Sequence, residues 1–541
     1  MAAAEELRET PDTLGAFPRL DEEQIAQVER HGERRPTHEG EVLFRQGDER
    51  YDFLVVLAGK VEVLDGDETH GRRIAVHGPG RFLGELSLLT GQAAFFTAVV
   101  REPGEVLAVP VERLRGLVSD SPALADVILR AFIQRREYLI GVGAGLKIVG
   151  SRYSHDTRRL REFAARNRLP HRWIDLDSDD EAESLLRGLG VAPEEAPIVI
   201  WRGKQVLRNP STAELAGAIG LRDHGSGETV CDLIVVGAGP AGLAAAVYGA
   251  SEGLSTLALE GVATGGQAGT SSRIENYLGF PAGISGAELA ERATIQAERF
   301  GARISVSVEA GSLEQLNGHY LVTSQDGKEV QGRTVLIATG ARYRKIPVPR
   351  LEEFEPTCVY YAATMTEAAL CRAHPVVVVG GGNSAGQATV FLAQHAERVD
   401  LVVRERNLTD HMSRYLADRI ERTPGVVVHL HSEVRELVGD RLLEAVVVED
   451  GETGDRSRIE ARELFIFCGA LPVTGWLDGQ LALDERGYLI TGEDAGSTLP
   501  LETSWPGVFA AGDVRCGSIK RVASAVGEGA MAVRMVHQRQ T

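Results

Sequence analysis

Cysteine is scarce in this chain, and no two cysteines have the spacing of a redox or metal motif. The fourteen histidines among the 541 residues form no HxxxH pattern and no cluster with cysteine. A zinc site and a CxxC dithiol centre are therefore not expected. We interpret the five cysteines as small, buried apolar residues; they are Cys231, Cys358, Cys371, Cys468 and Cys516.

The chain also lacks positive charge, a leader sequence and an uninterrupted apolar span. Its net charge is −19 and its pI is near 5.3, which argues against binding to nucleic acids or anionic membranes. The first ten residues, MAAAEELRET, have neither a basic nor an apolar region, so no signal peptide is expected. The longest apolar stretch, Leu233–Ala250, carries glycines at the spacing of a nucleotide-binding loop. We expect a cytoplasmic protein.

Patterns of hydrophobic and turn residues predict several domains of different classes. Residues 21–110 read as one helix and then short strands between turns, typical of a β-roll or jelly roll, and a helical run covers 111–139. Residues 146–223 alternate as βαβαββα, and the rest repeats strand, glycine loop and helix twice. The predicted fold class is thus multidomain: an N-terminal β-roll with helices, an α/β domain, and two nested α/β nucleotide-binding domains. The expected segments are residues 1–143, 144–223, 229–350, 351–478 and 479–541.

The first glycine loop has the spacing G-x-G-x-x-G between a strand and a helix. Gly237 makes the tight turn, Gly239 lets the backbone approach a pyrophosphate, and Gly242 lets the helix pack on the strand. The helix N-terminus offers free N–H groups to the phosphates. Glu260 ends the next strand, at the distance expected of an acid that binds ribose hydroxyls. The expected nucleotide contacts are Gly237, Gly239, Pro240, Ala241, Gly242 and Glu260.

From Val230 to its end the chain resembles thioredoxin reductase, a two-domain flavoprotein. The segments GGQAG, RIENYLGFP, LIATGARYR and GVFAAGDV match that family's flavin-contacting segments in the same order. The resemblance implies an FAD cofactor, with Gln267 and Asn276 near the isoalloxazine ring and Asp513 at the ribityl chain. It also implies a homodimer. Further FAD contacts are expected at Gly266, Thr339, Gly340, Gly512, Lys520, Arg521 and Val522.

The second glycine loop has the form G-x-G-x-x-A that binds NAD(P). Where NADPH-using reductases have His-Arg-Arg, this chain has Val403, Arg404 and Glu405. Arg404 is retained as a contact for a 2′-phosphate. Glu405 would repel that phosphate if it points inward, but would suit a bare ribose. We expect NADPH, with NADH as the alternative. The expected nicotinamide-nucleotide contacts are Gly380, Gly382, Asn383, Ser384, Ala385 and Arg404.

The redox centre of the resembling family is absent. Its Cys-Ala-Thr-Cys aligns with the run Ala362-Ala363-Thr364-Met365. In the family, one thiolate attacks the flavin and the pair carries two electrons out. Ala362 has no ionisable group, and the Met365 thioether forms no disulfide. Cys358 and Cys371 lie outside the motif and could pair only if the fold brought them within bonding distance.

The βαβαββα segment has lost a redox centre as well. Residues 147–177 resemble glutaredoxins and other thioredoxin-fold proteins, whose CxxC aligns without gaps on residues 154–157. Hydroxyl residues, Ser154 and Thr157, replace both thiols, while Pro197, usually cis in this fold, is retained. Ser154 is expected to cap its helix. A hydrolytic triad from adjacent Ser, His and Asp is not expected; a docking surface or a spacer is.

Residues Gly80–Val100 resemble the phosphate-binding cassette of cyclic nucleotide-binding domains. In that cassette a Glu binds the ribose and an Arg pairs with the cyclic phosphate. Gly84, Glu85 and Leu86 match its start, but the Arg position falls within Gln92–Phe95, which carries no cation. A buried phosphate would lack its partner. We therefore favour a structural role or an altered ligand over cyclic-nucleotide binding. No helix-turn-helix follows, so DNA binding is not expected.

The whole order resembles a bacterial family of cyclic nucleotide-binding, thioredoxin reductase-like proteins. The predicted function is that of an FAD-dependent NAD(P)H oxidoreductase without a protein disulfide. It would reduce an external acceptor directly: oxygen, a quinone, or a ferredoxin- or flavodoxin-type partner. One alternative is a non-catalytic redox or nucleotide sensor. A second is an authentic thioredoxin-disulfide reductase that uses a thiol outside the motif.

Overall fold

The computed structural model describes residues 7–540 except for short internal gaps. It divides into two compact units, which are described separately. The first comprises Met1–Ser226, Gly261–Ala263 and Ile295–Val308, and the second comprises Gly227–Glu260, Thr264–Thr294 and Glu309–Thr541. The gaps are residues 85–87, 89–91, 202–204, 223–229, 272, 275, 317, 356, 362, 364–366, 369–370, 372 and 441.

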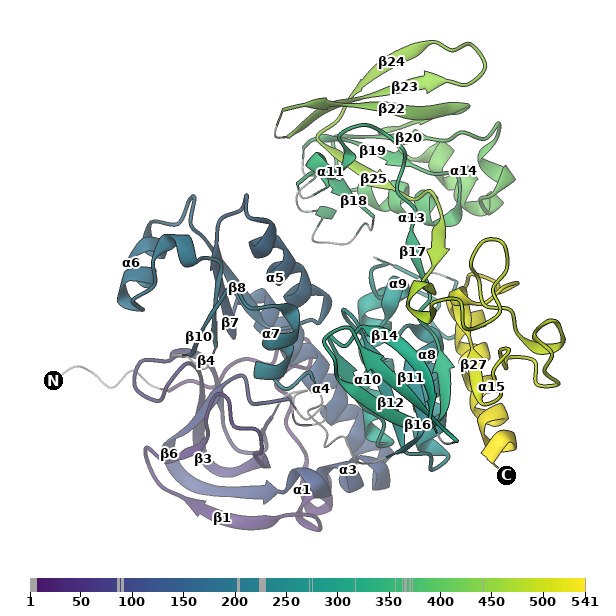
Figure 1. Cartoon of the computed structure of the whole chain (residues 1–541). Coiled ribbons are helices and arrows are strands. Elements are labelled where there is room, and N and C mark those ends of the chain that lie inside the picture. The colour runs from purple at the N-terminus through teal and green to yellow at the C-terminus, as the bar shows by residue number, and fades with distance from the viewer. Residues whose placement is uncertain are drawn as a thin grey trace. The chain divides into compact units, whose positions relative to one another are not determined.

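An antiparallel β-roll opens the first unit (Figure 1). Its strands run in the order β1-β6-β3-β4, with β2 beside β6 and β5 beside β3. Phe53, Phe82 and Phe132 form the centre of the core, with ring centroids 5.4 to 6.3 Å apart. The elements are α1 (Glu22–Glu29), β1 (Glu33–Thr37), β2 (Val42–Phe44), β3 (Phe53–Asp65), β4 (Arg72–His77), β5 (Phe82–Leu83), β6 (Thr97–Val109), α3 (Val111–Asp120) and α4 (Pro122–Gly141).

Two features of this roll differ from the sequence prediction. Strand β1 has the sequence ERRPT, and its polar residues and Pro36 gave no strand signal. It pairs with β6 alone, at the sheet edge where proline is tolerated. The long helical run is broken into α3 and α4, because Pro122 forces Ser121 out of helical geometry, to φ −129° and ψ 91°.

A mixed four-stranded sheet of order β10-β9-β7-β8 follows in the same unit. Strands β7 and β8 are parallel, and β9 and β10 are antiparallel to their neighbours. The Ala196–Pro197 bond is cis, as predicted. The elements are β7 (Leu146–Gly150), α5 (His155–Arg166), β8 (His171–Asp175), α6 (Asp180–Gly188), η1 (Pro193–Glu195), β9 (Ile198–Trp201), β10 (Gln205–Arg208) and α7 (Thr212–Ala218). Strand β13 (Arg303–Val306) belongs to the same unit but is not part of this sheet.

The second unit contains a sheet of order β12-β11-β16-β15-β14, with β27 beside β16. Strands β12, β11, β16 and β27 are mutually parallel. Helices α8 and α15 pack so closely that a side chain at Gly529 would overlap the Ala241 carbonyl. The elements are β11 (Cys231–Val236), α8 (Pro240–Ser251), β12 (Thr256–Glu260), α9 (Gly266–Gly269), α10 (Gly286–Arg299), β14 (Ala310–Leu316), β15 (His319–Ser324), β16 (Glu329–Ile337), β27 (Val508–Ala510), η5 (Gly512–Val514) and α15 (Val522–Gln540).

A second parallel sheet, β18-β25-β19-β20-β21, lies between two hydrophobic layers. Val376 and Val378 of β19 face one layer, and Val377 and Val379 face the other. Burial on both faces explains the unbroken run of valines. The elements are β17 (Ala341–Tyr343), α11 (Leu351–Phe354), β18 (Val359–Tyr360), β19 (Pro375–Val379), α13 (Asn383–Leu392), β20 (Arg398–Val402), α14 (Arg414–Arg422), β21 (Val426–His429), β22 (Ser432–Gly439), β23 (Leu443–Asp450), β24 (Arg456–Glu460), β25 (Glu463–Ile466) and β26 (Ala470–Pro472).

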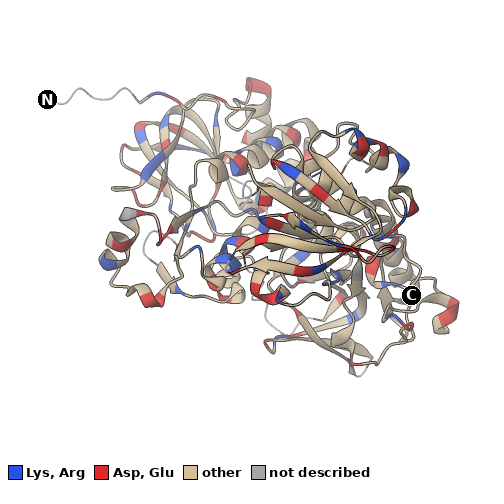
Figure 2. Cartoon of the chain, turned by 90° about the horizontal axis from the view of Figure 1, so that it is seen from above, with Lys and Arg blue, Asp and Glu red and all other residues tan. Residues whose placement is uncertain are grey.

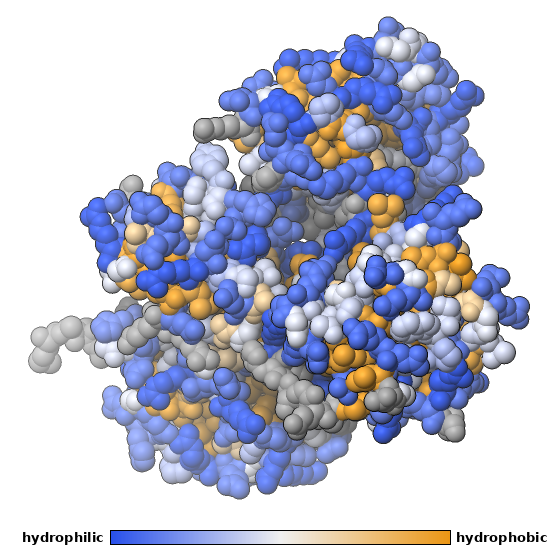
Figure 3. Space-filling model, in the orientation of Figure 1, coloured by the Kyte–Doolittle hydropathy of each residue, from blue (hydrophilic) through white to orange (hydrophobic). Residues whose placement is uncertain are grey.

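Acidic and basic residues alternate along the elements (Figure 2). On the face drawn in Figure 3, hydrophobic residues gather in separate patches between hydrophilic ones. Among the described residues, none of the helices has the length and apolar character needed to cross a membrane. The described residues also contain no group of three or more side chains that could hold a metal ion.

The carboxyl group of Glu463 is buried at the start of β25. Its Oε1 lies 3.6 Å from Nδ1 of His374, and its Oε2 has no hydrogen-bond partner among the described residues. Burial raises the pKa of Glu463 to about 7, although His374 opposes the shift. As pH rises from about 4.5 to about 7, the unfolded chain loses this proton first, so Glu463 lowers the stability across that window.

We therefore expect Glu463→Gln to increase the free energy of unfolding above pH 7 by roughly 1 kcal/mol, because it removes a buried negative charge. The increase should shrink toward about pH 5, where the wild-type group is protonated in the folded state. Urea unfolding of the flavin-loaded protein at both pH values measures it. Glu460→Gln, at an exposed position of β24, is the matched control; an equal increase in both variants would contradict the prediction.

Candidate functional site

The first glycine turn, between β11 and α8, leaves backbone exposed to an incoming group. Gly237 has φ +103°, and a side chain there would overlap the Ala338 carbonyl. A side chain at Gly242 would overlap the Gly237 carbonyl, so glycine is what allows the helix to pack against the turn. A Cβ at Gly239 would meet nothing nearer than the Gly266 Cα, at 3.9 Å. The open space above Gly239 fits the pyrophosphate of FAD.

Two groups complete this end of the turn. Glu260 accepts a hydrogen bond from the Ala238 amide at 2.8 Å, so the acid at the end of β12 lies against the turn as predicted. Helix α8 begins at Pro240, followed by Ala241, and its first amides have no partner within the helix. These amides and the positive end of the helix dipole favour an anionic group.

The second flavin motif lies at η5, after β27. The carboxylate of Glu528, from α15, accepts the Gly512 amide hydrogen at 2.7 Å and pairs with Arg515 at 2.6 Å. Burial raises the pKa of Asp513, and Lys520 opposes the shift. The Lys520 amine lies 3.4 Å from the Asp513 carbonyl oxygen. Glu528 was missed by sequence reasoning, because one acid within a helix gives no signal of where it points.

The other predicted flavin contacts are distributed around the same sheet. The Gln267 amide of α9 donates to the Ala341 carbonyl at 3.3 Å, and Gly266, beside it, has φ +52°. Thr339 donates to the Val473 carbonyl at 2.8 Å, and the Gly340 carbonyl accepts from the Val473 amide. Thr339 and Gly340 therefore hydrogen-bond to the segment that follows β26, the strand that pairs with β17. Asn276 and Arg521 are exposed, and Val522 is the first residue of α15.

The second glycine turn, between β19 and α13, repeats the geometry of the first. A Cβ at Gly380 would lie 2.5 Å from the Phe467 carbonyl oxygen, whereas a Cβ at Gly382 would meet no atom within 4 Å. Helix α13 starts at Asn383, whose side chain accepts a hydrogen bond from the Ser413 amide. Ser384 is exposed and Ala385 is fully buried. The space above Gly382 fits the pyrophosphate of a nicotinamide nucleotide.

Glu405 lies over this turn. A Cβ at Gly381 would be 2.5 Å from Oε2 of Glu405, so the carboxylate reaches the middle glycine. Its side chain is 16% exposed, while that of Arg404 is 72% exposed. The Arg404 Nε donates to Oε1 of Glu405 at 3.2 Å. The acid thus points inward, and the arginine predicted to bind a phosphate is paired with it.

Cys358 and Cys371 lie on opposite faces of the second parallel sheet. Cys358 packs with Val377 and Val379 of β19, and Cys371 packs with Val376 and Val378. The Cys358 sulfur accepts the Leu443 amide hydrogen at 3.3 Å. Burial raises the pKa of the Cys371 thiol far above its usual range. The sheet backbone separates the two thiols, so they cannot form a disulfide without unfolding the sheet.

The structure describes parts of two other motifs that lack their family's functional residues: the segment around Ser154 and the cassette around Gly84. The Ser154 side chain accepts the Thr157 amide hydrogen at the start of α5, as predicted. Thr157 is buried beside Gly150, whose Cβ position also lies 2.9 Å from Pro197. In the cassette, Gly84 has φ +120°. Glu85, Leu86, Ala362 and Met365 lie outside the described residues.

The cassette continues into a contact that the sequence did not predict. Phe95, the last residue of the stretch 92–95 that aligns with the family's phosphate-binding arginine, is fully buried, and its ring lies 4.9 Å from that of Trp201 in β9. The β-roll and the mixed sheet therefore share one hydrophobic core. A lone Phe-Phe pair gives no signal of whether it faces a ligand, a core or another domain.

Comparison with known proteins identifies the families that the chain resembles. Residues 231–529 match the family described as pyridine nucleotide-disulphide oxidoreductase, and residues 34–121 match the cyclic nucleotide-binding domain. Thioredoxin reductase of Treponema pallidum is 34% identical over 305 residues, 56% of this chain and 95% of that protein. NADPH-dependent thioredoxin reductase 3 of Arabidopsis thaliana is 31% identical over 347 residues, 61% of this chain and 64% of that protein. The crystal structure of T. acidophilum thioredoxin reductase is 31% identical and covers 58% of this chain and 99% of that one, with a TM-score of 0.54.

The chain therefore belongs to the pyridine nucleotide-disulphide oxidoreductase family, because the matching segment exceeds half its length. It is an FAD-dependent NAD(P)H oxidoreductase of the thioredoxin reductase-like kind that also carries a cyclic nucleotide-binding domain. The predicted family, enzyme class and cofactors are confirmed. The segment boundaries and the individual site residues stay predictions.

The open space at the two glycine turns predicts that a valine at each turn impairs a different nucleotide: FAD at the first and NAD(P)H at the second. Gly239 and Gly382 both precede a helix with negative φ, so valine fits the backbone at either position. We expect Gly239→Val to abolish FAD retention by occupying the pyrophosphate position. Gly382→Val should keep FAD but slow its reduction by NAD(P)H about a hundredfold or more, because the pyrophosphate contact is worth several kcal/mol.

The absorbance of the purified variants and anaerobic rapid mixing with NAD(P)H measure these two effects. Each variant serves as the folding control of the other. FAD loss from both, or from neither, would show that the turns do not hold separate nucleotides.

Proposed function

We propose that this oxidoreductase passes hydride from NAD(P)H to FAD and then reduces an external acceptor directly, without a protein disulfide. The observation that carries the proposal is the position of Cys358 and Cys371 on opposite faces of one sheet. The sequence offers no CxxC in their place. Oxygen, a quinone, or a ferredoxin- or flavodoxin-type protein are the acceptor classes. Homodimer formation and a cytoplasmic location stay predictions.

The proposed roles of the chain's own residues are binding and orientation. Bound FAD supplies two-electron redox chemistry, accepting hydride from the nicotinamide. The amides that follow Gly239 and Gly382 hold the two pyrophosphates. Glu260 orients a ribose through its hydroxyls. Glu528 holds the Gly512 turn at 2.7 Å, which keeps Asp513 in position for the ribityl chain.

The proposal predicts how much nicotinamide nucleotide the protein consumes. Anaerobic titration should bleach the flavin with one equivalent of NAD(P)H per FAD, because no disulfide takes a second electron pair. The double variant Ala362→Cys with Met365→Cys restores the family's motif and should consume a second equivalent. Flavin absorbance follows both titrations.

Two outcomes would overturn the proposal in different directions. A second equivalent consumed by the wild type and lost in Cys358→Ser or Cys371→Ser would favour an authentic disulfide reductase. Absence of bleaching by either nucleotide, with dithionite still reducing the flavin, would favour the non-catalytic sensor.

We further propose that the enzyme prefers NADH, although sequence reasoning favoured NADPH. A 2′-phosphate at the second turn would face the carboxylate of Glu405, which is mostly buried against Gly381. Two negative charges at that position repel each other, whereas the carboxylate can accept hydrogen bonds from the two hydroxyls of a bare ribose. Arg404 donates its Nε hydrogen to Glu405, so the acid partly offsets the positive charge that the arginine could offer to a phosphate.

Glu405→Gln should therefore lower the ratio of NADH to NADPH reduction rates by about tenfold or more, an amount that corresponds to about 1.4 kcal/mol. The rate of anaerobic flavin reduction gives this ratio independently of the acceptor. Arg406→Gln, on an 80% exposed side chain, is the control and should leave the ratio unchanged. A wild-type preference for NADPH, or a ratio that Glu405→Gln does not alter, would refute the role of Glu405.

The mixed sheet is proposed to be a thioredoxin-like domain that has kept its fold and lost its thiols. Its strand order, the cis Ala196–Pro197 bond and the Ser154 cap support this assignment. Thr157 fills the position of the second thiol and is buried. The domain is proposed to act as a docking surface or a spacer.

A further inference from the structure

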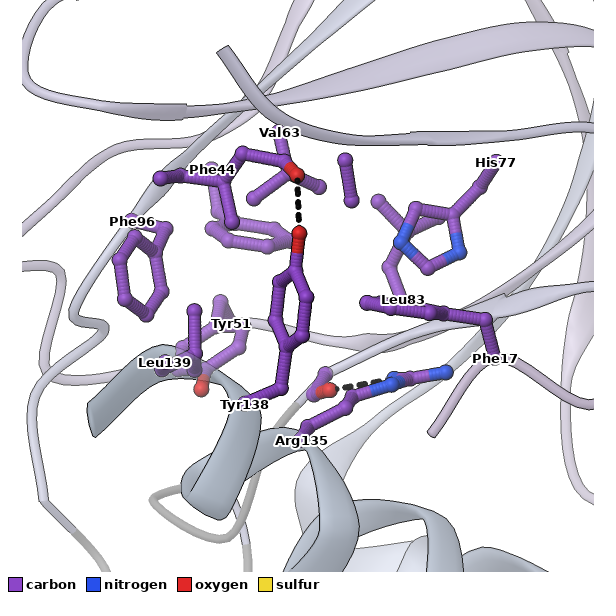
Figure 4. Close-up of a pocket in the computed structure, with 13 residues that line it drawn as sticks. Phe17, Phe44, Tyr51, Val63, His77, Leu83, Phe96, Arg135, Tyr138 and Leu139 are labelled. Carbon is purple, nitrogen blue, oxygen red and sulfur yellow. Dashed lines mark hydrogen bonds between the residues drawn. The ribbon is translucent and has the colours of Figure 1, made fainter. Parts of the chain in front are cut away.

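A cavity of about 40 Å³ lies inside the β-roll, against helix α4 (Figure 4). Its walls are almost entirely apolar. Side chains from the roll and from α4 converge on it, and the Tyr138 hydroxyl donates to the Ile74 carbonyl at its edge. Five of the thirteen described lining residues are phenylalanine or tyrosine: Phe17, Phe44, Tyr51, Phe96 and Tyr138.

Arg135, the cation at this cavity, is held by backbone. Its guanidinium donates to the carbonyls of Ala16, Gly84 and Phe82 at 2.6 to 2.9 Å. It also lies 4.5 Å above the Phe82 ring. Turning this group to an anion would leave buried carbonyls without their donor. The sequence supplies no lysine or arginine at positions 85–96 to replace it.

His77 gives the cavity a polar atom that lacks a partner. The side chain is 3% exposed, and its ring packs edge-on against Phe17 at 5.6 Å. Its Nδ1 has no hydrogen-bond partner among the described residues, and Figure 4 shows the ring at the cavity wall. Burial, assisted by Arg135 and Arg81, lowers the pKa of His77 well below its usual range. The imidazole is therefore neutral, and a buried polar nitrogen is stabilised by any ligand that pairs with it.

We propose that this cavity binds a small, uncharged and mostly apolar molecule through one hydrogen bond to His77, and that it does not bind cyclic nucleotides. A cyclic phosphate would bring a charge, and Arg135, the cation of the described lining, already donates to three backbone carbonyls. The volume of the cavity also excludes a cyclic nucleotide. An apolar cavity of about 150 Å³ admits benzene, so a space of about 40 Å³ suits a body of only a few non-hydrogen atoms.

The mixed sheet is in position to report occupancy of the cavity. Phe96 lines the cavity, and its neighbour Phe95 packs on the fully buried ring of Trp201. The Trp201 indole donates to the Ala218 carbonyl at 3.1 Å, which fixes its position. A ligand that shifts Phe96 therefore changes the surroundings of Trp201, and indole emission is sensitive to such a change.

The test uses the full FAD-loaded chain and ethanol, an uncharged molecule of three non-hydrogen atoms whose hydroxyl can donate or accept a hydrogen bond. We expect saturable heat of binding and a saturable change in tryptophan emission, and neither with cyclic AMP. His77→Leu should weaken ethanol binding about tenfold or more, and His77→Gln, which keeps a hydrogen-bonding group, about threefold or less. Trp201→Phe should keep the heat and lose the emission change.

Several results would overturn the proposal. They are tighter binding of cyclic AMP than of ethanol, the absence of ethanol binding, and equal binding in His77→Leu and the wild type. The FAD content and circular dichroism of every variant show that it is folded, so loss of binding with both unchanged reports the cavity. Ala75→Phe, which fills the lining, should abolish binding by an independent route.

Discussion

Both glycine turns of the second unit lie in close contact with neighbouring backbone, and the proposed nucleotide sites depend on these contacts. At Gly242 a side chain would overlap the Gly237 carbonyl, and at Gly380 it would lie 2.5 Å from the Phe467 carbonyl oxygen. The missing side chains let α8 and α13 begin directly above the parallel strands. The free amides of both helices are then held at the sheet edge where phosphates bind.

At two positions where the sequence resemblances indicate a lost functional group, the structure shows a packed side chain. Thr157, which the resemblance to thioredoxin-fold proteins aligns with a thiol, is buried against Gly150 and next to Pro197. Phe95, within the stretch 92–95 that aligns with the arginine of the cyclic nucleotide-binding cassette, contacts Trp201. Once a thiol or guanidinium has been replaced, burying the surrounding apolar surface stabilises the folded state. The side chains at both positions are accordingly buried in the first unit.

Charge controls the second nucleotide site at close range. The net charge of −19 says little about a single ligand, because solvent screens distant charges. Glu405 acts differently, since it is mostly buried and touches the glycine turn. Arg404, which alone would favour a phosphate, is paired with this acid at 3.2 Å. The same two residues therefore support opposite preferences, depending on which side chain points inward.

Local patterns in the sequence determined the element order, both glycine turns, the Ser154 cap and the absence of CxxC, because short-range sterics and spacing fix them. Strand β1 escaped sequence reasoning, since an edge strand needs few apolar residues. Only the tertiary structure decided the contact of Glu528 with Gly512, the inward direction of Glu405 and the separation of Cys358 from Cys371. Each of these depends on which face or helix a side chain meets across long sequence distances, and no local pattern carries that information.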